Sequence, residues 1–342
     1  MTPLCCVQTI SLRLNFNSSL EVALLSLFTL HFHMKLIIRA IALLTAIAPF
    51  AIYSQEAPAH PIKPLLWKIE GGDLKKPSYL FGTIHLGGGA LNKLHPTAQK
   101  AFDESDVILT EVPMDAKTQM GIAMKVMRKD GKTLADSIGA DLSKQLDDEL
   151  KAINPALNSK PFQPMCTWAI AATLPMLEAQ LTGATALDQK LWAAAVKKGK
   201  KTDAMETADF QVDLLASFTE AEQVNFLSET LRHMRKDREE GTNSVKDLTD
   251  AYIKGDAELL KDLIEKSFKE MREGPHKELG EKFCDKLLTQ RDKTMAATID
   301  EKLKKSPDTI HFFAAGSAHF TGDPSIRSHM EKAGYRITRV ED

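Results

Sequence analysis

Two histidines stand at the ends of matching apolar runs, one near each end of the chain. Residues 79–85 read YLFGTIH and residues 311–319 read HFFAAGSAH, so both runs end in Gly-x-x-His. A glycine lets the backbone turn tightly after a β-strand, and α/β sheets bind ligands at the carboxyl ends of their strands. His85 and His319 therefore meet if the two ends of the chain pair in one sheet. Two such imidazoles suit either a metal site or an acid–base pair.

A glutamate is the third candidate for this chemistry. Glu111 stands in the run VILTEV, residues 107–112, where an ionised carboxylate is costly to bury unless it is paired or bound to a metal. The alternative is an edge strand with Glu111 facing water, but the run is apolar on both faces, as in a central parallel strand. We expect Glu111 to lie beside His85 if their strands are neighbours.

Two further charged residues are candidates for the site, and each also has an interpretation without a site role. Glu206 follows a short strand and opens a helix, so it serves either the site or the helix N-terminus, where Thr207 is the expected cap. Arg291 lies in a helix rich in charged residues, and its spacing alone predicts that it is exposed.

The elements that must position these side chains come from both ends of the chain. Helices are predicted over 96–103, 187–198 and 324–333, and most of the region 115–304 has the three- and four-residue apolar spacing of helices. The predicted strands are 65–70, 78–81, 107–112, 201–205, 309–315 and 335–340. This pattern predicts an α/β fold, in which N- and C-terminal strands form a sheet and a large helical insert caps it.

The first residues predict export. Met34 and Lys35 begin a short basic stretch, residues 40–52 are apolar, and Ser54 places a small residue before a polar one. This is the pattern of a signal peptide over 34–54, whose apolar stretch is too short for a comfortable membrane span. We therefore expect residues 1–33 to be a non-native upstream extension, 55–64 to be a Pro-rich linker, and the protein to be periplasmic or secreted. The alternative is an N-terminal membrane anchor.

The composition bears on partners and on redox state. The 44 Lys and Arg residues nearly balance the 46 Asp and Glu residues, and no basic stripe with interleaved aromatic residues is present, so nucleic acid is a poor candidate partner. After removal of the signal peptide we expect no stable membrane span. Cys166 and Cys284 then remain, and they either form a disulfide in an oxidising compartment or stay separate buried thiols.

Taken together, the motifs resemble the TraB/GumN family, which includes the Tiki metalloproteases and is related more distantly to erythromycin esterase-like and ChaN-like proteins. The similarity runs from about residue 65 to about residue 340 in the family's order. Its motifs are LWKI at 66–69 with YLFGTIH at 79–85, Glu111, MET at 205–207 with Gln211, Arg291 with Met295, and GSAHFTG at 316–322.

The resemblance implies an α/β domain over 65–342 with two similar halves and a helical cap at about 115–304. It also implies a divalent-metal or acid–base site built from His85, Glu111 and His319, with Mn, Co or Zn as the suspected ion. Glu206, Gln211 and Arg291 match further motif positions and would line the same cleft. Asp292 departs from the Asn that the family commonly has after the arginine.

The sequence therefore predicts an exported metal-dependent hydrolase, with a peptide or small molecule as substrate and peptide or amide bonds as the first expectation. In a second version no metal binds, one histidine acts as general base on water, and Glu111 orients it. A rival from another class is a non-catalytic periplasmic protein that binds a ligand, for example as an accessory of a polysaccharide pathway.

Overall fold

The computed structural model describes residues 58–341, which lie within one compact unit, 52–342. The predicted upstream extension and signal peptide, residues 1–54, lie outside the described residues. Within the described range, no helix is both long enough and apolar enough to cross a membrane.

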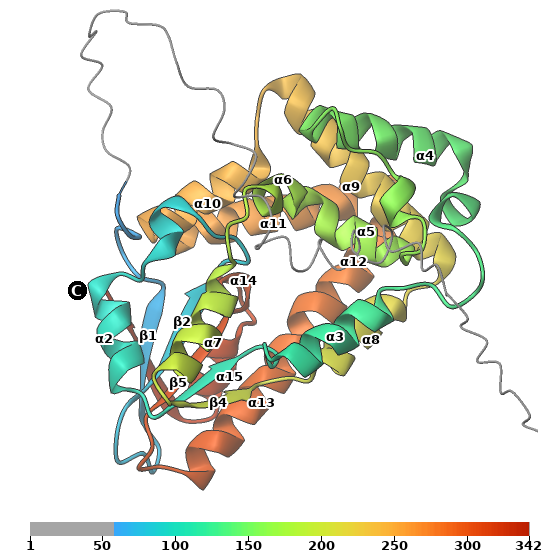
Figure 1. Ribbon diagram of the computed structural model, residues 1–342. Coiled ribbons are helices and arrows are strands. Elements are labelled where there is room, and N and C mark those ends of the chain that lie inside the picture. The colour runs from blue at the N-terminus through green and yellow to red at the C-terminus, as the bar shows by residue number, and fades with distance from the viewer. Residues whose placement is uncertain (1–57, 342) are drawn as a thin grey trace, which may run out of the picture. The chain divides into compact units, whose positions relative to one another are not determined.

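A six-stranded mixed sheet forms the centre of this unit, in the order β4-β3-β5-β2-β1-β6 (Figure 1). The four strands from β4 to β2 run parallel to one another, whereas β1 is antiparallel to both β2 and β6. The predicted α/β fold is confirmed. The strands are β1 Leu66–Gly71, β2 Ser78–Thr83, β3 Val107–Thr110, β4 Lys201–Ala204, β5 His311–Gly316 and β6 Tyr335–Val340.

Strand β5, from the C-terminal part of the chain, lies between β2 and β3. The strands that lead to His85 and Glu111 are therefore not neighbours, so the condition on which Glu111 was expected beside His85 is not met. All six residues of β5 are buried, which matches a central strand covered on both faces. Its register places Gly316 opposite Thr83. The N–H of Ser317 also donates to the carbonyl of Thr83 at 2.8 Å, which ties the two Gly-x-x-His segments together.

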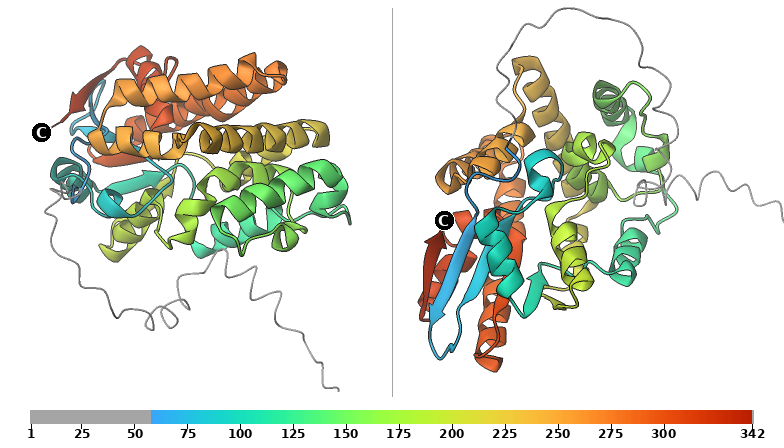
Figure 2. Two further views of the ribbon diagram at one scale, coloured as in Figure 1. Left: turned by 90° about the horizontal axis from the view of Figure 1, so that it is seen from above. Right: turned by 60° about the vertical axis from the view of Figure 1, so that its left-hand side comes forward.

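Helices cover both faces of the sheet (Figures 1 and 2). On one face lie α2 (Pro96–Glu104) and α7 (Leu187–Lys197), and on the other lie α13 (Gln290–Lys305) and α15 (Ile326–Lys332). The ring of Phe102 in α2 meets the edge of Phe312 in β5 at 5.7 Å between centroids. Fully buried Ile299 of α13 belongs to the same hydrophobic cluster, so the sheet and these helices share one core.

Helices α10 and α11 add Tyr252 and Leu260 to the cluster of the sheet. Helices α3 to α6, α8 and α9 build a second hydrophobic cluster, the cap cluster. Its centre consists of fully buried leucines of α4 and α9, among them Leu146 and Leu227. Side-chain and backbone groups form capping boxes at the starts of both helices, with Thr133 and Thr219 as the caps. Cys166 and Cys284 are free thiols. The helices are α3 Ala116–Lys125, α4 Leu134–Ile153, α5 Thr167–Thr173, α6 Leu177–Leu181, α8 Ala208–Ala216, α9 Glu220–Glu240, α10 Ser244–Lys254, α11 Ala257–Glu273 and α12 Lys277–Cys284.

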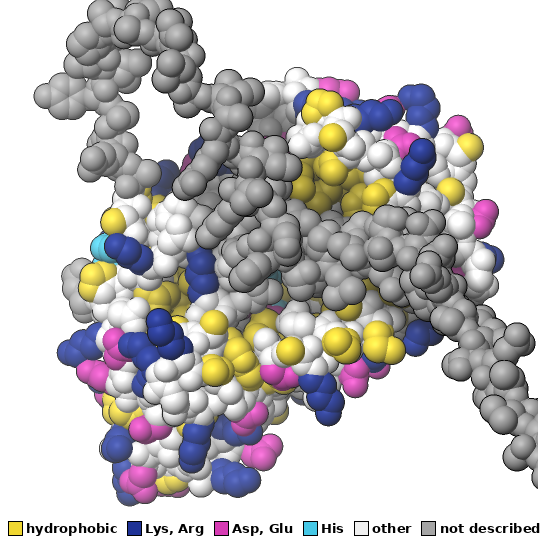
Figure 3. All heavy atoms as spheres, in the orientation of Figure 1, with side chains coloured by type: hydrophobic (Ala, Val, Ile, Leu, Met, Phe, Trp, Pro, Cys, Tyr) yellow, Lys and Arg dark blue, Asp and Glu magenta, His cyan; other side chains and the backbone are white. Residues whose placement is uncertain are grey.

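Opposite charges are interspersed on the face drawn in Figure 3, and apolar side chains show between them near α3. Two methionines of α3, Met120 and Met124, are the most exposed large apolar side chains among the described residues, at 66% and 64%. They stand four residues apart on a helix that buries none of its residues, so they share one face of that helix.

Candidate active site

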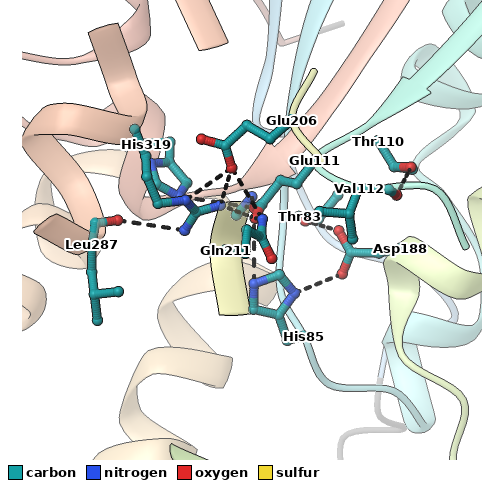
Figure 4. Close-up of polar contacts among 12 residues, drawn as sticks. Thr83, His85, Thr110, Glu111, Val112, Asp188, Glu206, Gln211, Leu287 and His319 are labelled. Carbon is teal, nitrogen blue, oxygen red and sulfur yellow. Dashed lines mark hydrogen bonds and ion pairs between the residues drawn. The ribbon is translucent and has the colours of Figure 1, made fainter. Parts of the chain in front are cut away.

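The carboxyl ends of the four parallel strands lie along one edge of the sheet, and each strand is followed by a candidate residue (Figure 4). His85 follows β2, Glu111 follows β3 and Glu206 follows β4. His319 follows β5, in the short helix α14 (Ala318–Thr321). The edge at which α/β sheets bind ligands therefore gathers side chains that are distant in the sequence.

Glu111 lies between the two histidines. Its Oε1 is 3.9 Å from Nε2 of His85 and 3.9 Å from Nε2 of His319. The same oxygen accepts the N–H of Gly316 at 2.6 Å. A Cβ on Gly316 would stand only 3.3 Å from Glu111 Oε1 and 3.4 Å from His85 Nε2. Because Gly316 has no side chain, the space between Glu111, His85 and His319 stays open.

Each histidine has a buried aspartate on its other ring nitrogen. Nδ1 of His85 lies 2.9 Å from Asp188, and Nδ1 of His319 lies 2.6 Å from Asp292. Thr83, the last residue of β2, donates its hydroxyl to the second oxygen of Asp188. Since a carboxylate only accepts, the imidazoles are the donors.

Sequence reasoning did not identify these aspartates as partners of the two histidines. Asp188 lies in the first turn of α7, where a carboxylate is favourable in any helix. The sequence around it therefore did not indicate a contact with a histidine. Asp292 drew attention only as a departure from the family's asparagine.

A buried arginine joins the two glutamates. Arg291 donates from Nη2 to Glu111 at 2.6 Å and from Nε to Glu206 at 2.9 Å. The amide of Gln211, in α8, also donates to both carboxylates, at 3.0 and 3.1 Å. The spacing prediction that Arg291 is exposed is wrong: its side chain is 11% exposed. It lies in the first turn of α13, directly after a π-helical segment, Asp285–Thr289, and faces the sheet.

Glu206 takes part in this network and also precedes a capped helix. Thr207 accepts the N–H of Phe210 as the predicted cap of α8, so Glu206 is not needed for that role. Its side chain is fully buried, and Oε1 has no hydrogen-bond partner among the described residues.

The charges shift the proton affinities of the site. Burial alone would raise the pKa of Glu111, but Arg291, His319 and His85 outweigh it, so the pKa lies well below its usual range. The charge of Asp188 raises the pKa of His85 to about 9, against the opposing effect of burial. Because the side chain of His85 is 52% exposed and that of His319 only 5%, the site meets solvent on the side of His85.

The comparison with known proteins agrees with the motifs. Residues 65–339, which include all of the site residues, match the TraB/PrgY/gumN family. The chain belongs to this family.

Curated relatives of this TraB/PrgY/gumN chain are named metalloproteases. A Metalloprotease TIKI homolog of Nematostella vectensis is 24% identical over 86% of this chain and 70% of its own length. Metalloprotease TIKI2 of Danio rerio is 24% identical over 80% and 60%, and human Metalloprotease TIKI1 is 20% identical over 81% and 62%. The chain thus spans less than two thirds of the length of the latter two. No solved structure matches the chain.

The site fits a divalent ion in the types of its donors. Two neutral imidazoles and a carboxylate are typical zinc ligands, and metal-binding histidines almost always donate their other N–H to an acceptor such as Asp188 or Asp292. Within residues 58–341, however, no group of three or more His, Cys, Asp or Glu side chains already has the geometry to hold a metal. Two ligands at ~2.1 Å from one ion lie at most ~4.2 Å apart, so the 3.9 Å spacings leave little margin.

Proposed function

We propose that this chain is an exported, metal-dependent hydrolase that acts on peptide or amide bonds. One observation carries the proposal: two imidazoles, each with Nδ1 held by a buried aspartate, direct Nε2 toward the same oxygen of a buried glutamate. Placing two carboxylate–imidazole pairs around a third carboxylate costs free energy of folding. Ionisable groups with shifted pKa values cluster at functional sites. The relatives named metalloproteases support the same class of reaction.

His85, Glu111 and His319 would hold the ion, which would activate a water molecule and polarise the scissile carbonyl. The other residues have roles that the contacts define. Arg291 and Gln211 fix Glu111 Oε2, so that Oε1 faces the histidines. His85 lies at the solvent side of the site, so a substrate would enter next to it.

The exposed apolar face of α3 supports a polypeptide substrate. The chain runs from Glu111 directly into α3, which carries the exposed Met120 and Met124. Methionine surfaces adapt to apolar side chains of varied shape. Export rests on the signal-peptide pattern at 34–54.

The test is to purify the chain, measure its bound metal, and assay hydrolysis of a peptide library with and without a chelator. We expect activity that the chelator removes, Co²⁺ or Mn²⁺ restores, and Glu111→Gln abolishes. His233→Ala, a histidine of the cap that pairs with Glu270, is the matched control and should retain activity.

Two results would contradict the proposal. Full activity in the metal-free protein would leave a histidine as general base. A ligand that binds without hydrolysis, and whose binding His85→Ala and His319→Ala remove, would identify a binding protein.

A further inference from the structure

We infer that Asp188 and Asp292 are the positioning residues of this site, which keep both histidines in the tautomer with the proton on Nδ1 and both Nε2 lone pairs directed at Glu111. This inference rests on the proposed function and deepens it. Neither aspartate contacts the shared space itself, because each acts through its histidine.

The hydrogen-bond chemistry gives the direction of this effect. A neutral imidazole carries one N–H, and an ionised carboxylate accepts but cannot donate. With Nδ1 of His85 at 2.9 Å from Asp188 and Nδ1 of His319 at 2.6 Å from Asp292, the proton of each neutral ring belongs on Nδ1. Nε2 is then an acceptor or a metal ligand.

Both aspartates are held firmly enough to impose this state. Each is 2% exposed, and an unpaired carboxylate at such depth is costly. Asp188 lies in the first turn of α7 and accepts the hydroxyl of Thr83 at the end of β2. Asp292 lies in the first turn of α13, next to Arg291. Four elements therefore fix the two rings: β2 through Thr83, α7 through Asp188, α13 through Asp292, and α14, which carries His319.

The two aspartates also explain why the rings of His85 and His319 have the same orientation although they lie in different environments. His85 is half exposed and His319 is buried, so packing alone would restrain them unequally. A carboxylate on each Nδ1 orients both rings in the same way. A purely structural ion pair would stabilise the fold and would not require that both Nε2 atoms face the same oxygen.

The first experiment measures Co²⁺ affinity directly, by chelator competition with the whole purified chain. Asp188→Ala and Asp292→Ala should each weaken Co²⁺ binding about 10- to 100-fold, the usual effect of losing such a partner. Asp188→Asn and Asp292→Asn should lose less, because the amide oxygen accepts the same N–H. Asp213→Asn, which removes an exposed carboxylate paired with Lys125, is the matched control and should bind Co²⁺ as the unmodified chain does.

The second experiment reads the tautomer without metal. Imidazole ¹⁵N shifts, recorded near pH 10 where histidines are ordinarily neutral and assigned by loss of signals in His85→Gln and His319→Gln, should show protonated Nδ1 for both rings. The asparagine variants should keep this pattern. Asp188→Leu and Asp292→Leu, or the alanine variants if the leucine chains do not fold, should lose it.

The two failures are distinguishable. If the unmodified chain does not bind Co²⁺, the metal-dependent function fails, while the ¹⁵N shifts still decide the positioning role. Protonated Nε2 in the unmodified chain, or alanine variants that bind Co²⁺ within about twofold of it, would overturn the inference.

Discussion

The backbone conformation of Gly316 does not require glycine, because its φ is not in the left-handed region. The reason for a glycine at this position is steric. The position where a Cβ would stand is 3.3 Å from Glu111 Oε1, 3.4 Å from His85 Nε2 and 3.8 Å from His319 Cδ2. An alanine would therefore occupy the space that these three side chains share, while the strand could keep its conformation.

We predict that Gly316→Ala folds but loses Co²⁺ binding and hydrolysis. Misplacement of reacting groups by about 1 Å can cost about 100-fold, so activity should fall at least that far. Gly322→Ala is the control in the same segment, since its Cβ would meet only Pro324 O at 3.6 Å. Circular dichroism, Co²⁺ titration and the peptide assay check both variants. Equal Co²⁺ affinity in the two variants would contradict the assigned role of Gly316.

The pH dependence of stability should report the pair of His85 and Asp188. In the metal-free protein the pKa of His85 is raised from 6.5 to about 9, so the folded state binds this proton more tightly than the unfolded state. The stabilisation is complete below pH 6.5 and is lost as the pH rises through about 9. Because half of the side chain is exposed, solvent screening makes the effect smaller than the shift alone suggests.

We therefore expect the urea concentration at the unfolding midpoint, measured with a chelator present, to decrease as the pH rises from 6.5 to about 9. Asp188→Asn should remove the fall that belongs to His85, because its largest cause is gone. The measurement is a series of urea unfolding curves for both proteins. Parallel pH profiles would show that another group is responsible.

The motifs identified His85, Glu111 and His319 because a glycine or an apolar run made each one unusual in its surroundings. Asp188 could not be identified in this way, since its partner lies far away in the sequence and its own turn is ordinary. Arg291 shows the opposite error. Its neighbours are charged and mostly exposed, and only the tertiary contacts with Glu111 and Glu206 bury it.

Among the elements, the strands were predictable and their order was not. Each predicted strand is present within a few residues, because β-branched and apolar runs bounded by turns are a local signal. The insertion of β5 between β2 and β3 depends on pairing between segments distant in the chain. Glu111 therefore reaches His85 across the end of β5, where glycine leaves room.

The loop after the first Gly-x-x-His motif contacts the start of α7 very closely. A Cβ on Gly87 would stand 1.9 Å from the carbonyl oxygen of Thr185. Nearby, the N–H of Leu187 donates to the carbonyl of Leu86 at 3.1 Å. These backbone contacts hold α7, and with it Asp188, against the segment that carries His85.

We predict that Gly87→Ala separates this loop from α7. The overlap is with backbone, so the segments must move apart, and overpacking of this kind costs about 1–3 kcal/mol. Co²⁺ affinity should fall as well, because Asp188 moves with α7. Gly121→Ala in α3 is the control: its Cβ meets nothing, and alanine should stabilise that helix by up to about 1 kcal/mol. Unchanged stability and Co²⁺ affinity in Gly87→Ala would refute the coupling.

In the unit as a whole, two large hydrophobic clusters have different relations to the site. The sheet cluster contains residues of β3, which leads directly to Glu111, and of β5, which ends at Gly316. The cap cluster is built mainly from α4, α5 and α9, none of which carries a site residue. Sequence periodicity predicted the helices between 115 and 304, but not that α7, α10, α11 and α13 pack into the cluster of the sheet while most of the others form their own core.

This division predicts that a substitution in the cap can lower the stability of the fold without changing the geometry of the site. Leu146→Ala in the cap and Leu109→Ala in β3 remove the same side chain from fully buried positions, so each should cost about 2–5 kcal/mol in free energy of unfolding. Leu146→Ala should leave the Co²⁺ affinity of the folded protein unchanged, since its cluster does not set the strand ends. Leu109→Ala should weaken it, because Leu109 stands two residues before Glu111 in the same segment. Urea unfolding and Co²⁺ titration below the unfolding transition measure both effects, and equal losses of Co²⁺ affinity would mean that the cap positions the site as strongly as the sheet does.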